Sequence, residues 1–426
     1  MNRLLVAASG VALLALGAAA AWGQATPATP APAAPAAAGG AATAAQQTLF
    51  KIGYIDIEDD PHYEREFVYQ LTMPNRTRIG IPDVPRYRPL PGAELGVAES
   101  NQTGAFSGAK YELVHYSGTN ADDLAKWIEK ARAEQGVNFF LIDADTDTIR
   151  SVSQAVRGQD VLLVNVTNPD DRLRGAFCSA NLAHTAPSYN MLTDAVTQYL
   201  VFQGWVNVLL ITGPRDEDKK IADALKRSIK RNGARLVEER SFVASNDPRQ
   251  RDQNNTRLLT GGTRDYDVVF IADSDGEFAR TFPYQTVRPR PVVGTGGLTP
   301  EVWHWTWERQ GAPQLSSRFH VATNRLMYGP DWSAWAAVRA LTLAQTRVKS
   351  LDFRTIREYV LSDQLRFDGY MGSPLDFRAW DHQLRMNVFL TLPNAVITRA
   401  PIDKFEHATN DLDTLGVDKP ETTCRF

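Results

Sequence analysis

Cysteine and histidine are scarce in this 426-residue chain, which holds two cysteines and seven histidines. Two cysteines cannot complete a structural zinc site, which takes about four ligands, and the histidines are too dispersed to propose a metal centre. The motifs Gly-x-Ser-x-Gly, His-Glu-x-x-His, the Walker loop and Cys-x-x-Cys are also missing, and Gly294-Thr295-Gly296 lacks the third glycine of a dinucleotide fingerprint. The sequence therefore predicts a protein that is not an enzyme and that requires no cofactor or metal.

Neither sign of charge dominates, because 46 Lys and Arg stand against 49 Asp and Glu, for a formal net charge of −3. This balance argues against nucleic acid as the partner. One apolar run, residues 4–20, follows a positive start and precedes small residues, which predicts a secretory signal peptide over residues 1–23, with an uncleaved anchor as the alternative. We therefore expect an exported protein, located in a periplasm and without membrane insertion of the mature chain.

Residues 24–48 are almost wholly Ala, Pro, Gly, Thr and Gln, which predicts a flexible linker. The two cysteines, Cys178 and Cys424, form an even pair. In an oxidising compartment such a pair predicts a disulfide, here one that ties a C-terminal tail, residues 401–426, to the middle of the chain. Two free thiols are the alternative.

After residue 49 the chain alternates apolar strand-like runs with helix-like segments. Strands are expected at residues 50–57, 110–116, 138–142 and 161–166, with helices at 92–100, 120–135 and 147–157. A Pro-rich and Arg-rich insertion, residues 59–91, interrupts this order. Nearly continuous apolar strands indicate a parallel sheet that is covered on both faces.

The same order then begins again. Helices are expected at residues 188–202, 218–232 and 251–259, and strands at 206–212, 235–242, 267–272 and 291–294. The last part is expected to hold a strand at 319–322, a helix at 330–346, and strands at 386–392 and 395–398. We predict an α/β fold of two lobes around a hinged cleft, each lobe a mainly parallel sheet flanked by helices. Lobe 1 would take residues 49–185 and about 321–349, and lobe 2 residues 186–320 and part of 350–400.

This organisation resembles the type I periplasmic solute-binding proteins of the branched-chain amino-acid transporter group. A more specific likeness lies in the segments LRGAFC (173–178), HTAPS (184–188), WHWTWE (303–308), DWSAWAA (331–337), LDTLG (412–416) and CRF (424–426). These segments are similar to a subfamily associated with alcohol oxidation that depends on pyrroloquinoline quinone (PQQ). The resemblance implies a monomeric binding protein of an ABC-type uptake system that closes around a planar anionic ligand, with PQQ as the expected one.

The resemblance also implies partners and alternatives. The partners would be an ABC permease, a PQQ-dependent dehydrogenase or an outer-membrane receptor. The alternative ligands are another aromatic acid or an amino acid. A further alternative is a ligand-free sensory or interaction module.

In such folds the ligand contacts the loops that follow the strands of both lobes. The residues so placed are His62, Tyr63, Asp143 and Thr167 in the first lobe, and Arg215 and Asp273 in the second. Near a crossing between the lobes lie Asn324, Arg325 and Trp332. The arginines could pair with ligand carboxylates. The aspartates suit an anion poorly and could instead cap the helices that follow them, or bind through water or metal.

Five of the nine tryptophans lie between Trp303 and Trp335, and three of them form the run Trp303, Trp305 and Trp307. The preceding residues 299–301 have the pattern of a helix start, with threonine as N-cap and then proline and an acid. On a helix Trp303 and Trp307 would share one side and Trp305 would point away, whereas an extended run would place all three on one face. We therefore expect two of the three rings to lie near the planar ligand and one in the core, and the helix N-terminus to receive a carboxylate.

Overall fold

The computed structural model of the chain describes residues 48–60, 63, 88–243 and 247–426. The expected signal peptide, nearly all of the linker, His62 and most of the insertion at 59–91 lie outside these residues. Within the described ranges, no helix is both long enough and apolar enough to cross a membrane.

The first sheet has five parallel strands in the order β2-β1-β3-β4-β5. These are β1 (Thr48–Ile57), β2 (Ala109–Gly118), β3 (Phe139–Asp143), β4 (Leu162–Asn165) and β5 (Leu182–His184). All five residues of β3 are buried, because its alternate side chains enter two different apolar clusters. Phe139 and Leu141 pack on the side of α2 (Leu90–Ser107) and α10 (Gly329–Val348), and Phe140 and Ile142 on the side of α3 (Ala121–Gln135) and α4 (Thr146–Ala155). The prediction of a parallel sheet covered on both faces is confirmed.

Helix α3 shows how local sequence sets the ends of these elements. The Asn120 side chain accepts a hydrogen bond from the Asp123 N–H at 3.0 Å, which caps the first turn. Gly136 ends the helix with a left-handed φ of 69°, a conformation that glycine adopts without steric cost. The apolar residues Leu124 and Ile128 face the sheet. The helix lies where the apolar spacing predicts it.

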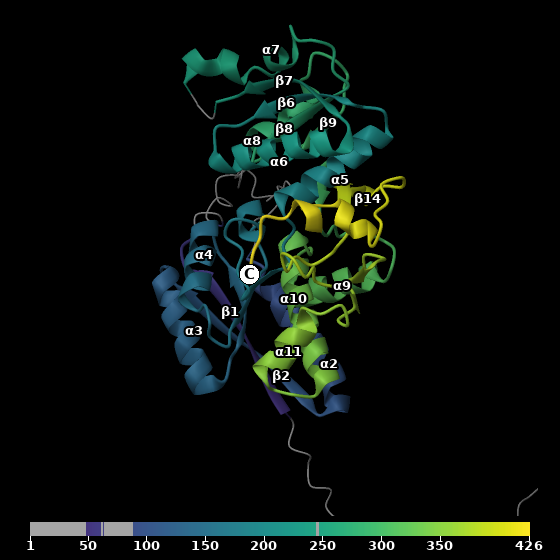
Figure 1. The fold of residues 1–426 in the computed structure, drawn as a ribbon. Helices are drawn as coiled ribbons and strands as arrows, with labels where there is room; N and C mark the ends of the chain where they lie inside the picture. The colour runs from purple at the N-terminus through teal and green to yellow at the C-terminus, as the bar shows by residue number, and fades with distance from the viewer. Residues whose placement is uncertain (1–47, 61–62, 64–87, 244–246) are drawn as a thin grey trace, which may run out of the picture. The chain divides into compact units, whose positions relative to one another are not determined.

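Helices α2 and α10 lie side by side against the first sheet (Figure 1). The Ser100 and Thr342 hydroxyl oxygens are 2.9 Å apart across the contact. A Cβ at Gly92 would lie 2.1 Å from the Asp331 carbonyl oxygen, so only glycine permits this close approach. Helix α11 (Phe353–Val360) packs against α10.

The second sheet has four parallel strands in the order β7-β6-β8-β9. These are β6 (Asn207–Thr212), β7 (Arg235–Ser241), β8 (Val268–Ala272) and β9 (Val292–Gly294). The helices of this part are α5 (Tyr189–Phe202), α6 (Asp216–Asn232), α7 (Thr256–Thr260) and α8 (Glu277–Thr281).

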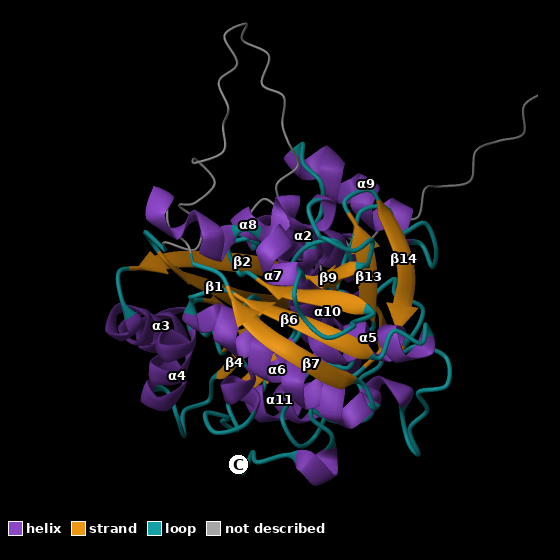
Figure 2. Ribbon diagram, turned by 90° about the horizontal axis from the view of Figure 1, so that it is seen from above, coloured by secondary structure: helices purple, strands orange, loops and turns teal. Residues whose placement is uncertain are grey.

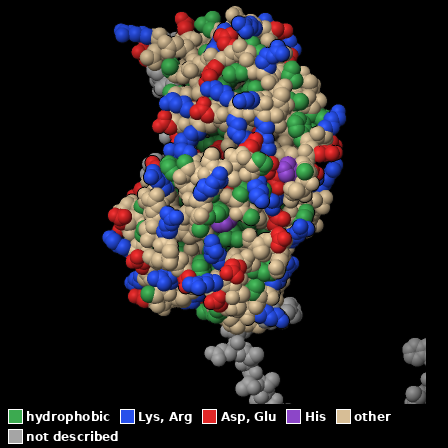
Figure 3. Space-filling model, in the orientation of Figure 1, with side chains coloured by type: hydrophobic (Ala, Val, Ile, Leu, Met, Phe, Trp, Pro, Cys, Tyr) green, Lys and Arg blue, Asp and Glu red, His purple; other side chains and the backbone are tan. Residues whose placement is uncertain are grey.

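On the face of the molecule drawn in Figure 3, Lys and Arg side chains are interspersed with Asp and Glu.

A third sheet is antiparallel, with strands β10 (Thr299–Glu301), β13 (Val388–Leu392) and β14 (Ala395–Ala400) in that order. Figure 2 shows β13 and β14 side by side. A short ribbon joins β11 (Phe367–Asp368) to β12 (Pro374–Leu375). The sequence predicts β13 and β14 but not β10.

One prediction for the last part is wrong. Residues 319–322, expected as a strand, belong to helix α9 (Ala312–Thr323), which buries Ala312, Leu315 and Phe319 at helical spacing. This helix contacts α2 beside the first sheet. A short apolar run does not distinguish a strand from a buried helix turn.

The C-terminal tail is held by a disulfide. Cys178 and Cys424 are bonded, with their Cα atoms 5.7 Å apart, so the predicted pairing is confirmed. Cys178 follows the fourth strand of the first sheet, and the tail reaches it after passing α5 and α6.

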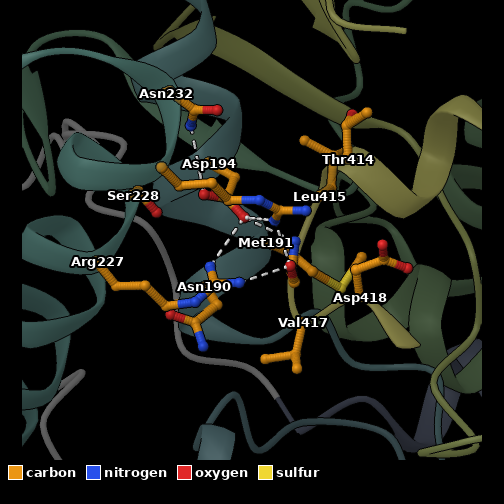
Figure 4. Close-up of polar contacts among 12 residues, drawn as sticks. Asn190, Met191, Asp194, Arg227, Ser228, Asn232, Thr414, Leu415, Val417 and Asp418 are labelled. Atoms are coloured by element: carbon orange, nitrogen blue, oxygen red, sulfur yellow. Dashed lines mark hydrogen bonds and ion pairs between the residues drawn. The ribbon is translucent and has the colours of Figure 1, made fainter. Parts of the chain in front are cut away.

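The tail also contacts a buried carboxylate between α5 and α6, which Figure 4 shows in detail. Asp194 is fully buried, and its carboxylate accepts a hydrogen bond from the Gly416 N–H at 2.8 Å. Arg227 and Arg231 of α6 donate to the same carboxylate oxygen, at 3.2 and 2.9 Å. Because Arg227 also pairs with Glu421 at 2.8 Å, the tail is fixed to this helix as well as to Cys178.

Candidate functional site

Buried polar side chains gather where the strands of the first sheet end. Asp56 lies next to the last residue of β1 and Asp143 is the last residue of β3, and the two are Cα partners in the parallel pair. Their exposed fractions are 0% and 2%. Ligands of open α/β sheets bind at the carboxyl ends of the strands, so these carboxylates mark a candidate site.

Asp143 is bound by hydroxyl groups. The Tyr63 hydroxyl donates to one carboxylate oxygen at 2.7 Å and the Tyr54 hydroxyl to the other at 3.1 Å. Burial raises the pKa of Asp143 to about 6, although hydrogen bonds from Tyr63, Thr167 and Tyr54 act in the opposite direction. Burial and the charge of Asp143 hold the pKa of both tyrosines well above 10, so that both hydroxyls remain donors.

Asp56 is neutralised by a cation. The Arg88 Nη1 atom lies 3.1 Å from its carboxylate, and the Ser117 hydroxyl donates to it at 2.5 Å. Arg88 also donates to the Ile57 and Glu58 carbonyl oxygens, at 2.6 and 3.2 Å, and so covers the end of β1.

Asp56, His115 and Ser117 have the composition of a catalytic triad but not its geometry. The His115 Nε2 atom lies 3.2 Å from Asp56 and 3.3 Å from the Ser117 hydroxyl. A proton relay uses one ring nitrogen for the acid and the other for the nucleophile. Because a single nitrogen faces both groups, this cluster does not form a relay.

Tyr63 and Arg88 cover the two carboxylates together. The Arg88 guanidinium carbon lies 4.8 Å from the centre of the Tyr63 ring, within the range of a cation–π contact. Tyr63 is bound to Asp143 and Arg88 to Asp56, so the chain supplies its own partners to both acids.

The strands of the second sheet also end in polar side chains, most of which bind one another. Asp218, fully buried, accepts hydrogen bonds from the Arg215 and Ser274 N–H groups at 2.9 and 2.6 Å. The Arg215 guanidinium forms an ion pair with Asp275. Asp273 accepts from the Ala279 N–H at 2.9 Å, inside α8, and burial raises the pKa of this carboxyl. These contacts fix the loops after β6 and β8.

The tryptophan run is not helical, which corrects the prediction made from residues 299–301. Those residues form β10, where the Thr299 hydroxyl lies 3.0 Å from the Thr391 hydroxyl of β13. Pro300 is tolerated because β10 is an edge strand of its sheet. The helix N-terminus that was expected to receive a carboxylate is therefore not present at this position.

The rings of the run have three different surroundings. Trp303 is fully buried and stacks on Trp332, with ring centres 6.4 Å apart, and its Nε1 has no hydrogen-bond partner within the described part of the chain. Trp305 is 36% exposed. Trp307 packs on Phe389 and donates from Nε1 to the Tyr370 carbonyl oxygen at 3.2 Å. The three rings thus share neither one side of a helix nor one extended face.

The residues expected near the crossing between the lobes connect α9 to α10. Arg325 forms two parallel hydrogen bonds with buried Asp331, at 2.7 and 2.6 Å, and Asn324 ends α9 with a left-handed φ of 57°. Trp332 is buried and donates to the Gly369 carbonyl oxygen at 3.0 Å. In the structure the side chains of Arg325 and Trp332 bind other parts of the fold, and Asn324 contributes its backbone conformation.

Of the predicted site residues, the structure brings Tyr63, Asp143 and Thr167 together at the first sheet. The sequence analysis missed Asp56 and Arg88. An acid inside the apolar strand 50–57 is a signal that could have identified Asp56. Arg88 carries no such signal, because it lies near the end of the insertion, far from Asp56 in the sequence.

Two parallel sheets with polar strand ends, followed by a chain that returns to the first sheet, define a two-lobe α/β architecture. The sequence model of the periplasmic binding protein family matches residues 90–249. No curated protein matches the chain.

Solved structures share this fold at low sequence identity. A periplasmic binding protein from Burkholderia mallei is 15% identical, with a TM-score of 0.61, over 89% of this chain and 99% of that one. A solute-binding protein of an ABC transporter from R. palustris, in complex with benzoate, is 12% identical, with a TM-score of 0.60, over 88% and 99%. A branched-chain amino acid transporter substrate-binding protein from Streptococcus pneumoniae, in complex with isoleucine, is 16% identical, with a TM-score of 0.60, over 83% and 99%. The predicted fold class is confirmed.

Proposed function

We propose that the protein is a periplasmic solute-binding protein of an ABC-type uptake system. It would close the strand ends of its two sheets around one small molecule and deliver this molecule to an inner-membrane permease. The observation that carries this proposal is the gathering of buried polar side chains at the carboxyl ends of parallel strands. Asp56 and Asp143 lie at the end of the first sheet, and at the second sheet Asp273 follows β8 and Asp218 lies in the first turn of α6. The family match over residues 90–249 supports it.

The ligand we propose is a planar acid. Asp56 and Asp143 would repel an anion if they were free, but Arg88 neutralises the first and two tyrosine hydroxyls bind the second. An amino-acid ammonium group would have to displace these internal partners. The Arg88 side chain is 31% exposed and lies over the Tyr63 ring, which suits an aromatic carboxylate. The relative that was solved with benzoate supports this ligand class.

PQQ is the planar acid to test first, because the sequence resemblance points to it. Since Trp303 and Trp332 are buried against each other, the rings of the tryptophan run that could stack on it are Trp305 and Trp307. A PQQ-dependent dehydrogenase would be the consumer of the delivered molecule.

The test is calorimetric titration of the purified protein with PQQ, benzoate and leucine in parallel. We expect saturable one-to-one binding of an aromatic acid and weaker or no binding of leucine. Preferential binding of leucine would show that the ligand is an amino acid rather than an aromatic acid, and the solute-binding function would stand. If none of the three binds, solute capture is contradicted and the sensory or interaction module becomes the better hypothesis.

A pair of tyrosine variants locates the binding site. Tyr63→Ala removes the ring that covers Asp143, and we expect this variant to bind the aromatic acid with at least tenfold lower affinity. Tyr284→Ala removes a side chain that is 89% exposed, and it should leave the affinity unchanged. Equal affinities in both variants would show that the acid binds away from the end of the first sheet.

A further inference from the structure

One face of α10 carries a cation-rich stripe that the proposed function does not use. Trp335, Arg339, Leu343 and Arg347 follow one another at intervals of four residues, so they lie on the same side of the helix. Together with Arg366, Phe367, Asp368 and Tyr370 they line a cavity of about 310 Å³. This volume falls in the range of small-molecule sites, roughly 300–1,000 Å³. None of the acids at the strand ends lines it.

Positive charge exceeds negative charge in this cavity. Three arginines line it, Arg339, Arg347 and Arg366, against one acid, Asp368, whose carboxylate already accepts from the Tyr370 N–H at 2.7 Å. No ion pair within the described ranges involves any of the three arginines. Three arginines that line one cavity without an ion pair among the described residues make it positively charged, so the cavity favours an anion.

The hydrogen bonds of these arginines are to neutral groups. The Arg339 Nη1 atom donates to the Ser100 hydroxyl at 3.2 Å. Arg347 donates to the Tyr359 hydroxyl at 3.0 Å and to the Gln364 carbonyl oxygen at 3.4 Å, which holds the segment before Arg366 against α10. Arg325, by contrast, donates two hydrogen bonds to the Asp331 carboxylate. The charge of Arg325 is thus balanced within the fold, whereas the cavity arginines have no carboxylate partner among the described residues.

Aromatic rings form the remaining wall. The Trp335 and Tyr370 rings lie 5.6 Å apart, and Phe367 lines the same cavity. The Trp335 Nε1 atom donates to Glu99 at 2.9 Å, and the Tyr370 hydroxyl accepts from Arg318 at 3.4 Å. Trp335 is 1% exposed and Phe367 8%, so the ring that offers apolar surface to a ligand is that of the half-buried Tyr370.

We infer that this cavity is a binding site for a small planar anion with two or more carboxylates, separate from the strand ends. Guanidinium groups pair with carboxylates through two parallel hydrogen bonds, and aromatic surface favours a flat ring over an aliphatic chain. The site goes beyond the proposed function and does not depend on it.

The test titrates the full chain with benzene-1,3,5-tricarboxylate, and with citrate as a tricarboxylate that has no ring. We expect saturable binding of the aromatic acid, at least tenfold tighter than that of citrate, and a loss of affinity when the salt concentration is raised. Arg366→Gln and Arg339→Gln should each weaken this binding at least tenfold. Arg366 is the preferred position, because its exposed side chain has no described hydrogen bond that the fold would lose.

The matched control is Arg354→Gln on α11, where an 80% exposed arginine lies 3.9 Å from Asp160 and outside the cavity. This variant should bind benzenetricarboxylate as the wild type does. The inference is overturned if wild type shows no saturable binding, if citrate binds equally well, or if Arg366→Gln and Arg354→Gln have the same affinity. Titration of Arg366→Gln with benzoate separates the two sites, since a ligand at the strand ends should bind this variant as it binds wild type.

Discussion

Asp56 and Asp143 are Cα partners on adjacent parallel strands, and their buried carboxylates are stabilised in different ways. Asp56 has the Arg88 guanidinium at 3.1 Å, whereas Asp143 has the neutral hydroxyls of Tyr54 and Tyr63. A neutral donor compensates less of the cost of burying a charge than a cation does. Burial therefore raises the pKa of Asp143 to about 6.

This pKa predicts that Asp143 makes folding stability depend on pH. A carboxyl has a pKa of about 3.9 in the unfolded chain, so the folded state binds the proton more tightly. The stabilising contribution of the Asp143 proton to the free energy of unfolding is then fully present below about pH 4. This contribution is lost as the pH rises through about 6. Between pH 4 and 6.5, the free energy of unfolding of wild type should fall by on the order of 2 kcal/mol more than that of Asp143→Asn.

Urea denaturation at several pH values checks this difference. Burial also raises the pKa of Asp171 to about 6, but Asp171 is present in both proteins and cancels in the comparison. Parallel pH profiles for wild type and Asp143→Asn would contradict the raised pKa of Asp143 in the folded protein.

A second prediction concerns the role of Trp303. Because Trp303 is fully buried and stacked on Trp332, Trp303→Ala should leave a large cavity and lower the free energy of unfolding by about 3–5 kcal/mol. Trp305→Ala, at a ring that is 36% exposed, should cost under about 1 kcal/mol. Thermal melting together with ligand titration checks both variants. A Trp303→Ala protein with near-normal stability and lost ligand affinity would restore the stacking role that its sequence suggests.

Local sequence predicts the parallel strands and their helices because their signals are contained in the elements themselves. The strand at 139–143 is a continuous apolar run that ends in an acid, and α3 has its own Asn120 cap and its Gly136 end. The rule that site residues follow strands correctly groups Tyr63, Asp143 and Thr167 at one edge. For such features tertiary contacts agree with local preference.

The remaining features depend on contacts between distant parts of the chain. Residues 299–301 carry the pattern of a helix start, yet the Thr299 hydroxyl contacts Thr391, 92 residues away, and pairing with β13 makes the segment a strand. The ion pair of Arg88 with Asp56 joins the end of the insertion to the end of β1, a contact that no local pattern encodes. The burial of Trp303 likewise depends on Trp332 of α10.

A third prediction concerns the buried carboxylate between α5 and α6. Asp194→Asn would leave Arg227 and Arg231 facing an uncharged amide in a buried position, with the Gly416 N–H beside it. Breaking a buried ion pair by removing one partner costs about 3–5 kcal/mol, and the expected loss in the free energy of unfolding is of this size.

The control for Asp194 is Asp216→Asn, at an 83% exposed carboxylate that pairs with Lys219 at 2.9 Å on the surface of α6. Exposed pairs of this kind contribute little to stability, because water and salt screen them. Urea denaturation of both variants checks the contrast. Similar losses for the two would mean that the Asp194 cluster is no more important to stability than a surface pair.

The last prediction separates the two attachments of the C-terminal tail. The disulfide between Cys178 and Cys424 closes a loop with a sequence separation of 246, and the chain-entropy account gives a stabilisation on the order of 5 kcal/mol for a loop of this length. The double variant Cys178→Ser/Cys424→Ser should therefore lose about 2–5 kcal/mol in the free energy of unfolding. Its tail should nevertheless stay docked, because Asp194 still binds the Gly416 N–H and Arg227 still pairs with Glu421. Limited proteolysis should remove the tail slowly from the double variant and quickly from the triple variant that adds Asp194→Asn. If the double variant loses its tail as fast as the triple variant, the disulfide alone holds the tail and the ionic contacts to α6 contribute nothing to its attachment.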